Sequence, residues 1–506
     1  MTSTPVRAGQ HITVAGLGVS GISAARALAG LGAEVTVVDG GDGPAHRERA
    51  EALRAEHIRV RLGDGVTLPP GTSLVVTSPG WKPSSPLFAA AAAAGVDVVG
   101  DVEIAWRLRG SSAGASPGPR GPEAGGSAAP WLAVTGTNGK TTTVRMLASI
   151  LSAAGLRTTA VGNIGTPLID VVLEDKAARE ARSTEGGGGR PEAVPYDVLA
   201  VELSSYQLHW APSLRAHSGA VLNLAPDHLD WHGSMEAYAA DKGRIYQGNQ
   251  VACVYNAADK ATEDLVREAD VEEGCRAIGF TLSTPAPSQL GVVDGILVDR
   301  AFVPDRHKQA QELAEVSDIQ PPAPHNIANA LAAAALARAY GVPATAVRDG
   351  LRAFRPDAHR MQHVADVAGV AYVDDSKATN THAAEASLAA YGSIVWVAGG
   401  LAKGATFDEL VAKSASRLRG VVLIGADRAL IREALARHAP EVPVVDLDRT
   451  DTGAMAAVVR EAARLASPGD TVLLAPACAS MDMFTNYNVR GDVFAEAVRD
   501  LSAKGA

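Results

Sequence analysis

Cysteine is scarce in this 506-residue chain, which contains three: Cys253, Cys275 and Cys478. So few thiols cannot form the disulfide framework of a small secreted domain. No two of them have the C-x-x-C spacing that is typical of redox motifs and zinc sites. The cysteine content therefore predicts a protein of a reducing compartment.

Positive charge and long apolar runs are also scarce. The 46 lysines and arginines are outnumbered by 56 aspartates and glutamates, so the net charge is −10 at pH 7. This balance argues against a general nucleic-acid or anionic-membrane binder, because both functions need clustered Lys and Arg. No apolar run reaches the roughly 18 residues that a membrane-spanning helix needs, and the first ten residues lack the apolar core of a signal peptide. We expect a cytoplasmic protein that is not inserted in a membrane.

Length and composition predict three domains. At roughly 150 residues per domain, 506 residues correspond to about three. Residues 110–129 are almost entirely Gly, Ser, Ala and Pro, a composition typical of a linker. A second polar, Gly-rich segment, residues 174–193, is predicted to be a loop without a chemical role. We assign residues 1–109, 130–355 and 356–506 to the three domains.

Short apolar segments alternate with helical patterns in all three parts. Strands that are covered by helices on both faces predict parallel sheets. We therefore expect an α/β fold, with Rossmann-like first and third domains and a central P-loop-type ATPase domain whose sheet is mostly parallel. The predicted strand segments are 11–18, 34–39, 73–80, 131–136, 197–205, 219–228, 370–375, 393–400, 420–425, 442–447 and 471–477, and the predicted helices include 20–32, 87–95, 142–155, 234–247 and 325–340.

The sharpest local motif is VTGTNGKT at residues 134–141, where an apolar strand enters a Gly-rich turn and then a helix. Such glycines let backbone N–H groups close around phosphate oxygens, and the helix N-terminus adds its dipole. Lys140 would reach the β and γ phosphates, and the Thr141 hydroxyl would bind Mg²⁺. The motif departs from the standard P-loop at Val134, which replaces a glycine. The alternative is a glycine turn with a chance lysine, but the strand–turn–helix context favours a nucleoside triphosphate site.

Two predicted strands of the central part lead to groups suited to hard cations, Glu202 in one case and Asp227 with His228 in the other. Ligands of open α/β sheets bind beyond the carboxyl ends of the strands. A carboxylate opposite a P-loop commonly holds Mg²⁺ or positions a water. The alternatives are that Glu202 stabilises a helix N-terminus and that His228, with Asp230 and His232 nearby, only caps a helix. On residue chemistry alone, a histidine ligand would be unusual for magnesium.

Lys242 falls on an otherwise apolar helical stripe. If Ser234 caps the helix, Lys242 shares one face with Tyr238, Ile245 and Tyr246. A lysine in that position either snorkels to solvent or is buried with a partner. In the buried case its pKa would be depressed and the neutral amine would be available for reaction.

The N-terminal segment GLGVSG, residues 16–21, follows a predicted strand, and Asp39 ends the next strand. This arrangement satisfies the dinucleotide-binding fingerprint and by itself predicts NAD. An NAD-dependent oxidoreductase is therefore one alternative for the whole chain, and a regulatory P-loop ATPase is another.

Seven motifs, read in order, resemble the Mur ligases, which are ATP-dependent amide ligases of peptidoglycan precursor synthesis. The motifs are TGTNGKTT, NIG, ELSSYQL, APDHLDWHGS with DKGRIY, PHNIANALAA, DDSKATN and APACASMDMF. The resemblance covers nearly the whole chain except residues 110–129 and the insert near 174–193. It is closest to the family member that adds D-glutamate, because SKATN and PACASMDMF favour that member and a DNPR motif is absent. TGTNGKT alone also occurs in folylpolyglutamate synthases, so another Mur or folylpolyglutamate-type amide ligase is the alternative.

The resemblance implies a reaction and its partners. A cytoplasmic enzyme, expected to be a monomer, would join D-glutamate to UDP-N-acetylmuramoyl-L-alanine through an acyl phosphate, with ATP and Mg²⁺. This acid–amino-acid ligase would act in cell-wall biogenesis, and so in cell shape and division. The first domain would hold UDP where the fingerprint alone predicts NAD. The second would hold ATP and magnesium, and the third would bring D-glutamate by domain closure.

The resemblance also implies roles for individual residues. The ATP contacts are Gly136, Thr137, Asn138, Gly139, Lys140, Thr141, Thr142, Asn326, Asn329, Arg360 and Asp375, whereas His325 is given no role. The magnesium ligands are Thr141, Glu202, His228 and Lys242, the last as a carbamate. The UDP-substrate contacts are Val19, Ser20, Asp39, Ser78, Gly80 and Asn163, and the D-glutamate contacts are Thr379, Lys403 and Ser480. The catalytic set is Lys140, Glu202, His228, Lys242 and Lys377. Taken singly, Ser480 could be a helix cap and Lys403 a solvated turn lysine.

Overall fold

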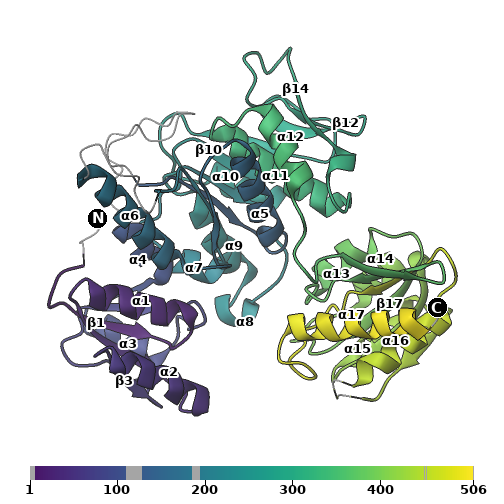
Figure 1. The fold of residues 1–506 in the computed structure, drawn as a ribbon, viewed down its shortest axis with the longest axis horizontal. Coiled ribbons are helices and arrows are strands. Elements are labelled where there is room, and N and C mark those ends of the chain that lie inside the picture. Colours follow the sequence, from purple (N-terminus) through teal and green to yellow (C-terminus); the bar gives the residue numbers. More distant parts are fainter. Residues whose placement is uncertain (1–5, 110–127, 185–193, 450, 452, 505–506) are drawn as a thin grey trace. The chain divides into compact units, whose positions relative to one another are not determined.

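The computed structural model describes residues 6–109, 128–184, 194–449, 451 and 453–504 (Figure 1). The predicted linker at 110–129 lies almost entirely outside the described residues. The chain forms two compact units, Met1–Ile319 with Ile327–Phe354, and Gln320–Asn326 with Arg355–Ala506. The first unit contains two sheets and the second contains one.

The N-terminal sheet has five parallel strands in the order β3-β2-β1-β4-β5. Its strands are β1 (His11–Ala15), β2 (Glu34–Asp39), β3 (Arg59–Leu62), β4 (Leu74–Thr77) and β5 (Asp97–Gly100). Alternate side chains bury opposite faces, since Val14 and Val37 face one core while Ala15 and Val38 face another. Helices α1 (Val19–Gly30), α2 (Pro44–Ala55) and α4 (Asp101–Leu108) cover the first face, and α3 (Pro86–Ala93) covers part of the second.

The central sheet has nine strands in the order β14-β13-β12-β11-β10-β9-β6-β8-β7. The seven neighbouring strands β12-β11-β10-β9-β6-β8-β7 pair in parallel. At the other edge, β13 pairs antiparallel with both β12 and β14. The strands that position the predicted site are β6 (Trp131–Thr135), β7 (Ala160–Gly162), β8 (Leu199–Glu202) and β9 (Ser218–Val221). The other five strands were not predicted and are β10 (Ala252–Asn256), β11 (Arg276–Phe280), β12 (Gln289–Val293), β13 (Ile296–Asp299) and β14 (Gln311–Glu315).

Three helices bury one face of the central sheet, namely α5 (Lys140–Ala153), α11 (Pro324–Ala339) and α12 (Ala344–Ala353). The helices α5 and α12 cross closely at Gly350, where an added Cβ would lie 2.3 Å from the Cα of Ile150. The short helices α7 (Ser205–His209), α8 (Leu229–His232) and α9 (Met235–Gly243) follow the strand ends, and α10 (Lys260–Arg267) follows β10.

The prediction of a loop at residues 174–193 is wrong for its first half. Helix α6 (Leu168–Thr184) continues through it, because apolar Val171 and Val172 are buried in a core shared with α1 and α4, and Ala178 further along the helix is also buried. The buried carboxylate of Asp175 in this helix accepts hydrogen bonds from the Arg179 side chain and from the Tyr196 N–H. Residues 185–193 lie outside the described part of the chain.

The C-terminal sheet has six strands in the order β15-β16-β20-β17-β18-β19. Among the described strands of this sheet, β15 alone is antiparallel to its neighbour. Two layers of helices cover it, α13 to α15 on one face and α16 and α17 on the other. The elements are β15 (Gln362–Val367), β16 (Val370–Asp374), α13 (Thr381–Leu388), β17 (Ile394–Gly399), α14 (Asp408–Ser414), β18 (Leu418–Ile424), α15 (Arg428–His438), β19 (Val444–Asp446), α16 (Ala454–Leu465), β20 (Thr471–Leu474) and α17 (Tyr487–Lys504).

These sheets confirm the predicted α/β class, with parallel sheets covered on both faces. Within the described residues, no helix combines the length and the apolarity that crossing a bilayer requires.

Candidate active site

The phosphate loop connects β6 to α5, as predicted. Gly136 and Gly139 have φ values of +152° and +83°, which residues other than glycine rarely adopt. The loop is held from outside, because the Asn138 N–H donates to Asn223 Oδ1 at 2.9 Å and Asn223 Nδ2 donates back to the Asn138 carbonyl oxygen at 3.2 Å. The loop is therefore fixed to the segment that follows β9.

Lys140 and Lys242 both point their ammonium groups at this loop. Lys140 Nζ donates to the carbonyl oxygens of Gly136 and Thr137, each at 2.8 Å, and Lys242 Nζ donates to the Gly136 oxygen, also at 2.8 Å. Lys242 is 2% exposed, so the snorkelling alternative is wrong. Burial, together with the neighbouring charge of Lys140, lowers the pKa of Lys242 well below its ordinary value.

The stripe predicted for Lys242 is confirmed. Tyr238, Ile245 and Tyr246 are all buried with it, and Ser234 caps α9 by accepting a hydrogen bond from the Ala237 N–H at 3.2 Å. The last turn, Arg244–Tyr246, continues as a 3₁₀ helix.

Glu202 ends β8, directly beside the phosphate-loop strand β6. Its carboxylate is 1% exposed and accepts hydrogen bonds from Thr141 Oγ1 at 2.8 Å and from Asn163 Nδ2 at 3.0 Å. Ser204 begins α7 with a capping box that it shares with Gln207, so the chain turns sharply after Glu202. Parallel pairing thus brings together three predicted residues from distant parts of the sequence.

His228 is the N-cap residue of α8, with a left-handed φ of +54°. Burial lowers the pKa of its imidazole, and the charges of Lys140 and Lys242 add to this effect, while Asp227 opposes it. The Nε2 atom lies 3.5 Å from Asp227 Oδ2, and the ring centroid lies 5.0 Å from that of Tyr206. The imidazole of His228 is therefore close enough to the two lysines for their charges to act on its pKa.

The oxygen donors around the loop fit a magnesium ion. Mg²⁺ keeps several waters and phosphate oxygens and takes only one or two protein ligands, such as the Thr141 hydroxyl and the Glu202 carboxylate. A free Lys242 amine does not fit, whereas a carbamate on it would supply oxygen. Among the described residues, no three His, Cys, Asp or Glu side chains gather as a metal-binding group.

Asp39 and Ser78 lie close to the N-terminal glycine turn. The Asp39 carboxylate accepts hydrogen bonds from the N–H groups of Leu17 and Gly41, both at 2.8 Å. At Gly16 an added Cβ would lie 2.8 Å from Ser78 Oγ, which is buried and has no hydrogen-bond partner among the described residues. A buried hydroxyl without a partner calls for an explanation, and a ligand bound at the glycine turn would supply one.

The remaining predicted contacts of this domain are open to solvent. Val19 is 73% exposed, Gly80 is exposed, and Ser20 is half-buried. Asn163, predicted to contact the same substrate, belongs to the segment after β7 and bonds to Glu202 instead.

Three family models match successive parts of the chain. Residues 10–100 match the MurD-like N-terminal domain of Mur ligases, residues 134–337 match the Mur ligase middle domain, and residues 359–478 match the glutamate ligase domain. The chain is 76% identical over 495 residues to the UDP-N-acetylmuramoylalanine–D-glutamate ligase of Streptomyces avermitilis, a match covering 98% of this chain and 99% of that protein. The chain belongs to the Mur ligase family. This confirms the predicted family and the resemblance to its D-glutamate-adding member.

A second sequence relative and two solved structures are also Mur ligases. The protein of the same name from Thermobifida fusca is 57% identical over 494 residues, covering 98% of this chain and 99% of that protein. Among solved structures, a MurF ligase from Thermotoga maritima in complex with ADP superposes with a TM-score of 0.55 at 16% identity, covering 93% and 96% of the two chains. The UDP-N-acetylmuramate–alanine ligase of the same organism gives 0.53 at 17%, covering 97% and 99%. These two structures support the three-domain α/β fold.

In the C-terminal unit of this Mur ligase, the predicted residues lie in loops at the carboxyl ends of neighbouring strands. Lys377 and Thr379 follow β16, Lys403 follows β17, and Ser480 follows β20. The last two loops are joined by reciprocal backbone hydrogen bonds between Leu401 and Ala479, at 2.9 and 3.0 Å. Ser480 is buried, whereas Lys403 is exposed and has a left-handed φ of +50°.

The predicted ATP contacts outside the phosphate loop differ in their environment. Asp375 is buried and accepts hydrogen bonds from the Met361 N–H and the Ser387 hydroxyl, and burial raises its pKa to about 6. Arg360 is half-buried, with Nε 3.9 Å from Asp357. Asn326 and Asn329, one turn apart on α11, are both buried. Asn329 lies against the phosphate loop, where an added Cβ on Gly139 would lie 2.3 Å from its Oδ1.

Arg490 is a residue of this region that sequence reasoning missed. It lies on α17, is 1% exposed, and donates to Ser376 Oγ at 2.9 Å, to the Ser376 carbonyl oxygen at 2.8 Å and to the Cys478 carbonyl oxygen at 3.1 Å. One guanidinium thereby connects the loop of Lys377 with the loop of Ser480. Burial lowers the pKa of Arg490 to about 10. In the sequence it is one arginine in an amphipathic helix, so no local pattern identifies it.

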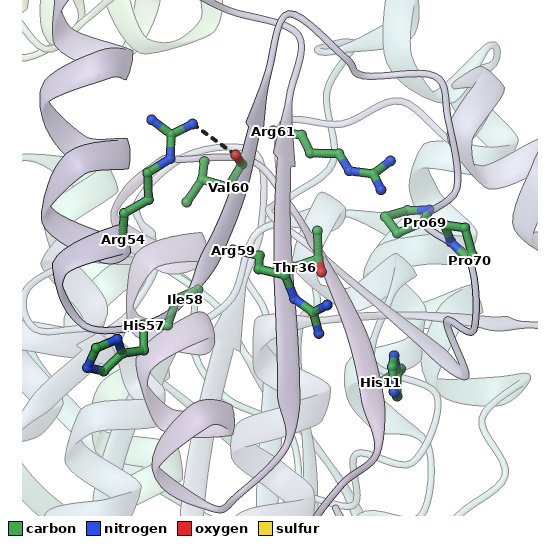
Figure 2. Close-up of a pocket in the computed structure, with 10 residues that line it drawn as sticks. All are labelled: His11, Thr36, Arg54, His57, Ile58, Arg59, Val60, Arg61, Pro69 and Pro70. Atoms are coloured by element: carbon green, nitrogen blue, oxygen red, sulfur yellow. Dashed lines mark hydrogen bonds between the residues drawn. The ribbon is translucent and has the colours of Figure 1, made fainter.

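A cavity of about 700 Å³ opens elsewhere, in the N-terminal domain (Figure 2). It lies near the beginnings of β1 and β3, and none of the predicted site residues lines it. Glu34 pairs with both His11 and Arg59 beside it, and Arg54 donates to the Val60 carbonyl oxygen, so much of its basic charge is already partnered.

Proposed function

We propose that this Mur ligase joins D-glutamate to UDP-N-acetylmuramoyl-L-alanine, with ATP converted to ADP and phosphate. The substrates are those in the names of the relatives at 76% and 57% identity. The observation that carries the proposal is the cluster of half-buried Lys140 with buried Thr141, Glu202 and Lys242 where β6 and β8 end. Membership in a ligase family favours amide bond formation over the oxidoreductase and ATPase-switch alternatives.

The chemistry follows from the poor leaving group of a carboxylate. Transfer of the γ-phosphoryl group to a carboxylate oxygen of the L-alanyl residue gives an acyl phosphate and ADP. The D-glutamate amine then attacks the carbonyl carbon, and the C–O bond to phosphate breaks as the C–N bond forms and the amine loses a proton. Lys140 would neutralise transferred charge, and the loop N–H groups would hold the phosphates in line. Bound magnesium would supply further charge neutralisation, held by Thr141 and Glu202 with His228 close by.

Lys242 is proposed to react with CO₂. Its neutral amine nitrogen would form a bond to the CO₂ carbon and lose a proton, which converts a cationic side chain into an anionic carbamate with two oxygens. The depressed pKa of the buried lysine favours this reaction, since only the unprotonated amine is nucleophilic. The product would remove the repulsion between Lys242 and Lys140.

The remaining assignments are proposals of the same kind. The UDP end would bind the N-terminal glycine turn with Val19, Ser20, Asp39, Ser78 and Gly80. The ATP site would include residues 136–142 with Asn326, Asn329, Arg360 and Asp375. D-glutamate would bind Thr379, Lys403 and Ser480, with Lys377 assisting. Domains bounded at 109, 130 and 355, a cytoplasmic location and a monomeric state complete the proposal.

The deciding experiment measures phosphate release from ATP and Mg²⁺ with both substrates together and with each alone. Release only with both, together with a new amide product by mass spectrometry, is the expected result. Replacement of D-glutamate by L-glutamate serves as the control for the third domain. Release that needs neither substrate would overturn the ligase assignment, and release with another amino acid would overturn the D-glutamate site alone.

A further inference from the structure

Asp241, the residue directly before Lys242, is the centre of a buried hydrogen-bond network. Its carboxylate lies 2.9 Å from the Nδ1 atom of His209 and 3.0 Å from the Nδ1 atom of His232. An ionised carboxylate offers only acceptors, so each ring presents an N–H at Nδ1. The Nε2 atom of His232 is hydrogen-bonded to the Ser205 hydroxyl at 2.9 Å.

This network joins the three short helices that carry or follow the proposed magnesium-site residues. Glu202 lies two residues before the N-cap of α7, His228 is the N-cap of α8, and Lys242 lies in α9. Asp241 belongs to α9, His209 to α7 and His232 to α8. One carboxylate therefore fixes the relative positions of all three helices.

The helix α8 needs such support because it has only four residues and no side-chain cap. Its last residue, His232, has a side chain that is 0% exposed and held at both ring nitrogens. On its other side, Trp231 Nε1 donates to the Trp81 carbonyl oxygen at 3.1 Å. These anchors hold His228 in its left-handed conformation at the start of the helix.

We propose that Asp241 is a positioning residue for the magnesium site, which orients Glu202, His228 and Lys242 through His209 and His232 without touching ATP or the metal. The inference rests on the proposed function and extends it to the residues behind the site. Residues that orient metal ligands from behind commonly change metal affinity tenfold to a hundredfold when they are replaced.

The test is the affinity of Mn²⁺, used as a spectroscopic probe, for the full-length protein with a non-hydrolysable ATP analogue, followed by electron paramagnetic resonance. Asp241→Asn keeps the shape but removes the negative charge. Its amide nitrogen would also place a donor against either the imidazoles or Arg244, whose Nε lies 3.1 Å from Asp241 Oδ1. We expect its Mn²⁺ dissociation constant to rise about tenfold. The Mg²⁺ concentration for half-maximal phosphate release should rise in parallel.

Asp299→Asn is the matched control. Asp299 is a fully buried carboxylate of the same domain that accepts from the Ala301 and Phe302 N–H groups and pairs with Arg338 at 2.9 Å. Its replacement should lower the melting temperature and leave Mn²⁺ affinity unchanged. A merely structural role for Asp241 would give the same pattern.

Ser205→Ala provides a milder variant if Asp241→Asn fails to fold. It removes only the outermost hydrogen bond of the network and should weaken Mn²⁺ binding about threefold. Parental Mn²⁺ affinity in a folded Asp241→Asn protein, or in Ser205→Ala where the first does not fold, would overturn the inference. Metal binding is measured without the muramoyl substrate or glutamate, so failure of the proposed ligase reaction would be seen separately in the unmodified protein.

Discussion

Lys140 and Lys242 donate to the same acceptor, the carbonyl oxygen of Gly136, each at 2.8 Å. Two lysine nitrogens thus meet at one backbone oxygen inside the protein, where two positive charges would repel each other strongly. Lys242 is the more buried of the two and has the lowered pKa. The arrangement favours loss of its proton and explains why this lysine is suited to a modification that reverses its charge.

Replacement of Lys242 by arginine should reduce ligase turnover at least about 100-fold, because a guanidinium stays protonated and cannot form the carbamate. Phosphate release measures turnover, and ¹³C NMR after incubation with labelled bicarbonate measures the carbamate. Lys260→Arg, at an exposed helical ion pair, is the control and should leave both unchanged. An arginine variant with parental turnover would exclude a role for the modification.

Thr141→Val removes the hydroxyl that bonds to Glu202 while keeping the side-chain shape. We expect the Mg²⁺ requirement for turnover to rise about tenfold, because one oxygen donor is lost and Glu202 loses a partner. Thr143→Val, two residues along the same helix, removes a buried hydroxyl without a hydrogen-bond partner among the described residues. That control should be neutral or slightly stabilising, and equal effects of the two variants would contradict the assignment.

Gly139→Ala should weaken ATP binding more than it lowers stability. An alanine in this left-handed backbone conformation costs about 1 kcal/mol of stability, and its Cβ would also lie 2.3 Å from Asn329 Oδ1. Gly155→Ala has a similar φ of +77° but nothing within 4 Å of the added Cβ, so it isolates the backbone cost. Nucleotide titration and chemical unfolding of both proteins separate the two effects, and equal ATP affinities would argue against a role for the contact.

Arg490→Lys should loosen the two loops that carry Lys377 and Ser480. A lysine cannot make all three hydrogen bonds that the buried guanidinium donates to Ser376 and Cys478. We therefore expect the C-terminal unit to lose about 2–4 kcal/mol of stability. The KM for D-glutamate should rise with little change in the KM for ATP. Arg352→Lys, at an exposed ion pair with Asp318, is the control. A parallel rise in both KM values would indicate general unfolding.

His217 predicts an acid-sensitive contribution to stability. The ring is buried beside Tyr340, and burial lowers its pKa to about 4, below the value of about 6.5 in an unfolded chain. Protonation therefore favours the unfolded state. The contribution is complete above about pH 6.5 and is lost as the pH falls toward 4, by up to about 3 kcal/mol. Urea unfolding between pH 4 and 7 should show a shallower pH dependence for His217→Gln, and an unchanged slope would contradict the assignment.

Local patterns predicted the elements that carry the site. The glycine turn at 136–139, the apolar strand before Glu202 and the stripe of Lys242 all have the structures that their periodicity indicates. The loop prediction at 174–193 was wrong for its first half because apolar residues of α6 are buried against helices of the N-terminal domain. This burial stabilises the helix only in the folded protein, so it leaves no local signal in the sequence. Strands β3, β5, β7 and β10 to β15 were missed because their short segments carry no strong period.

The amino-acid order is enough to predict which chemical groups are available: a phosphate-binding turn, acids after strands, and one lysine on an apolar stripe. It is enough because these signals are local, set by glycine conformation and by the periods of helices and strands. Which of these groups contact one another depends on the folded arrangement of the chain. Parallel pairing of β6 with β8 brings Thr141 to Glu202, α9 places Lys242 against Gly136, and a buried arginine on α17 joins two distant loops. The pKa of Lys242 and the hydrogen bonds of Asp241 arise from burial and proximity between residues that are far apart in the sequence.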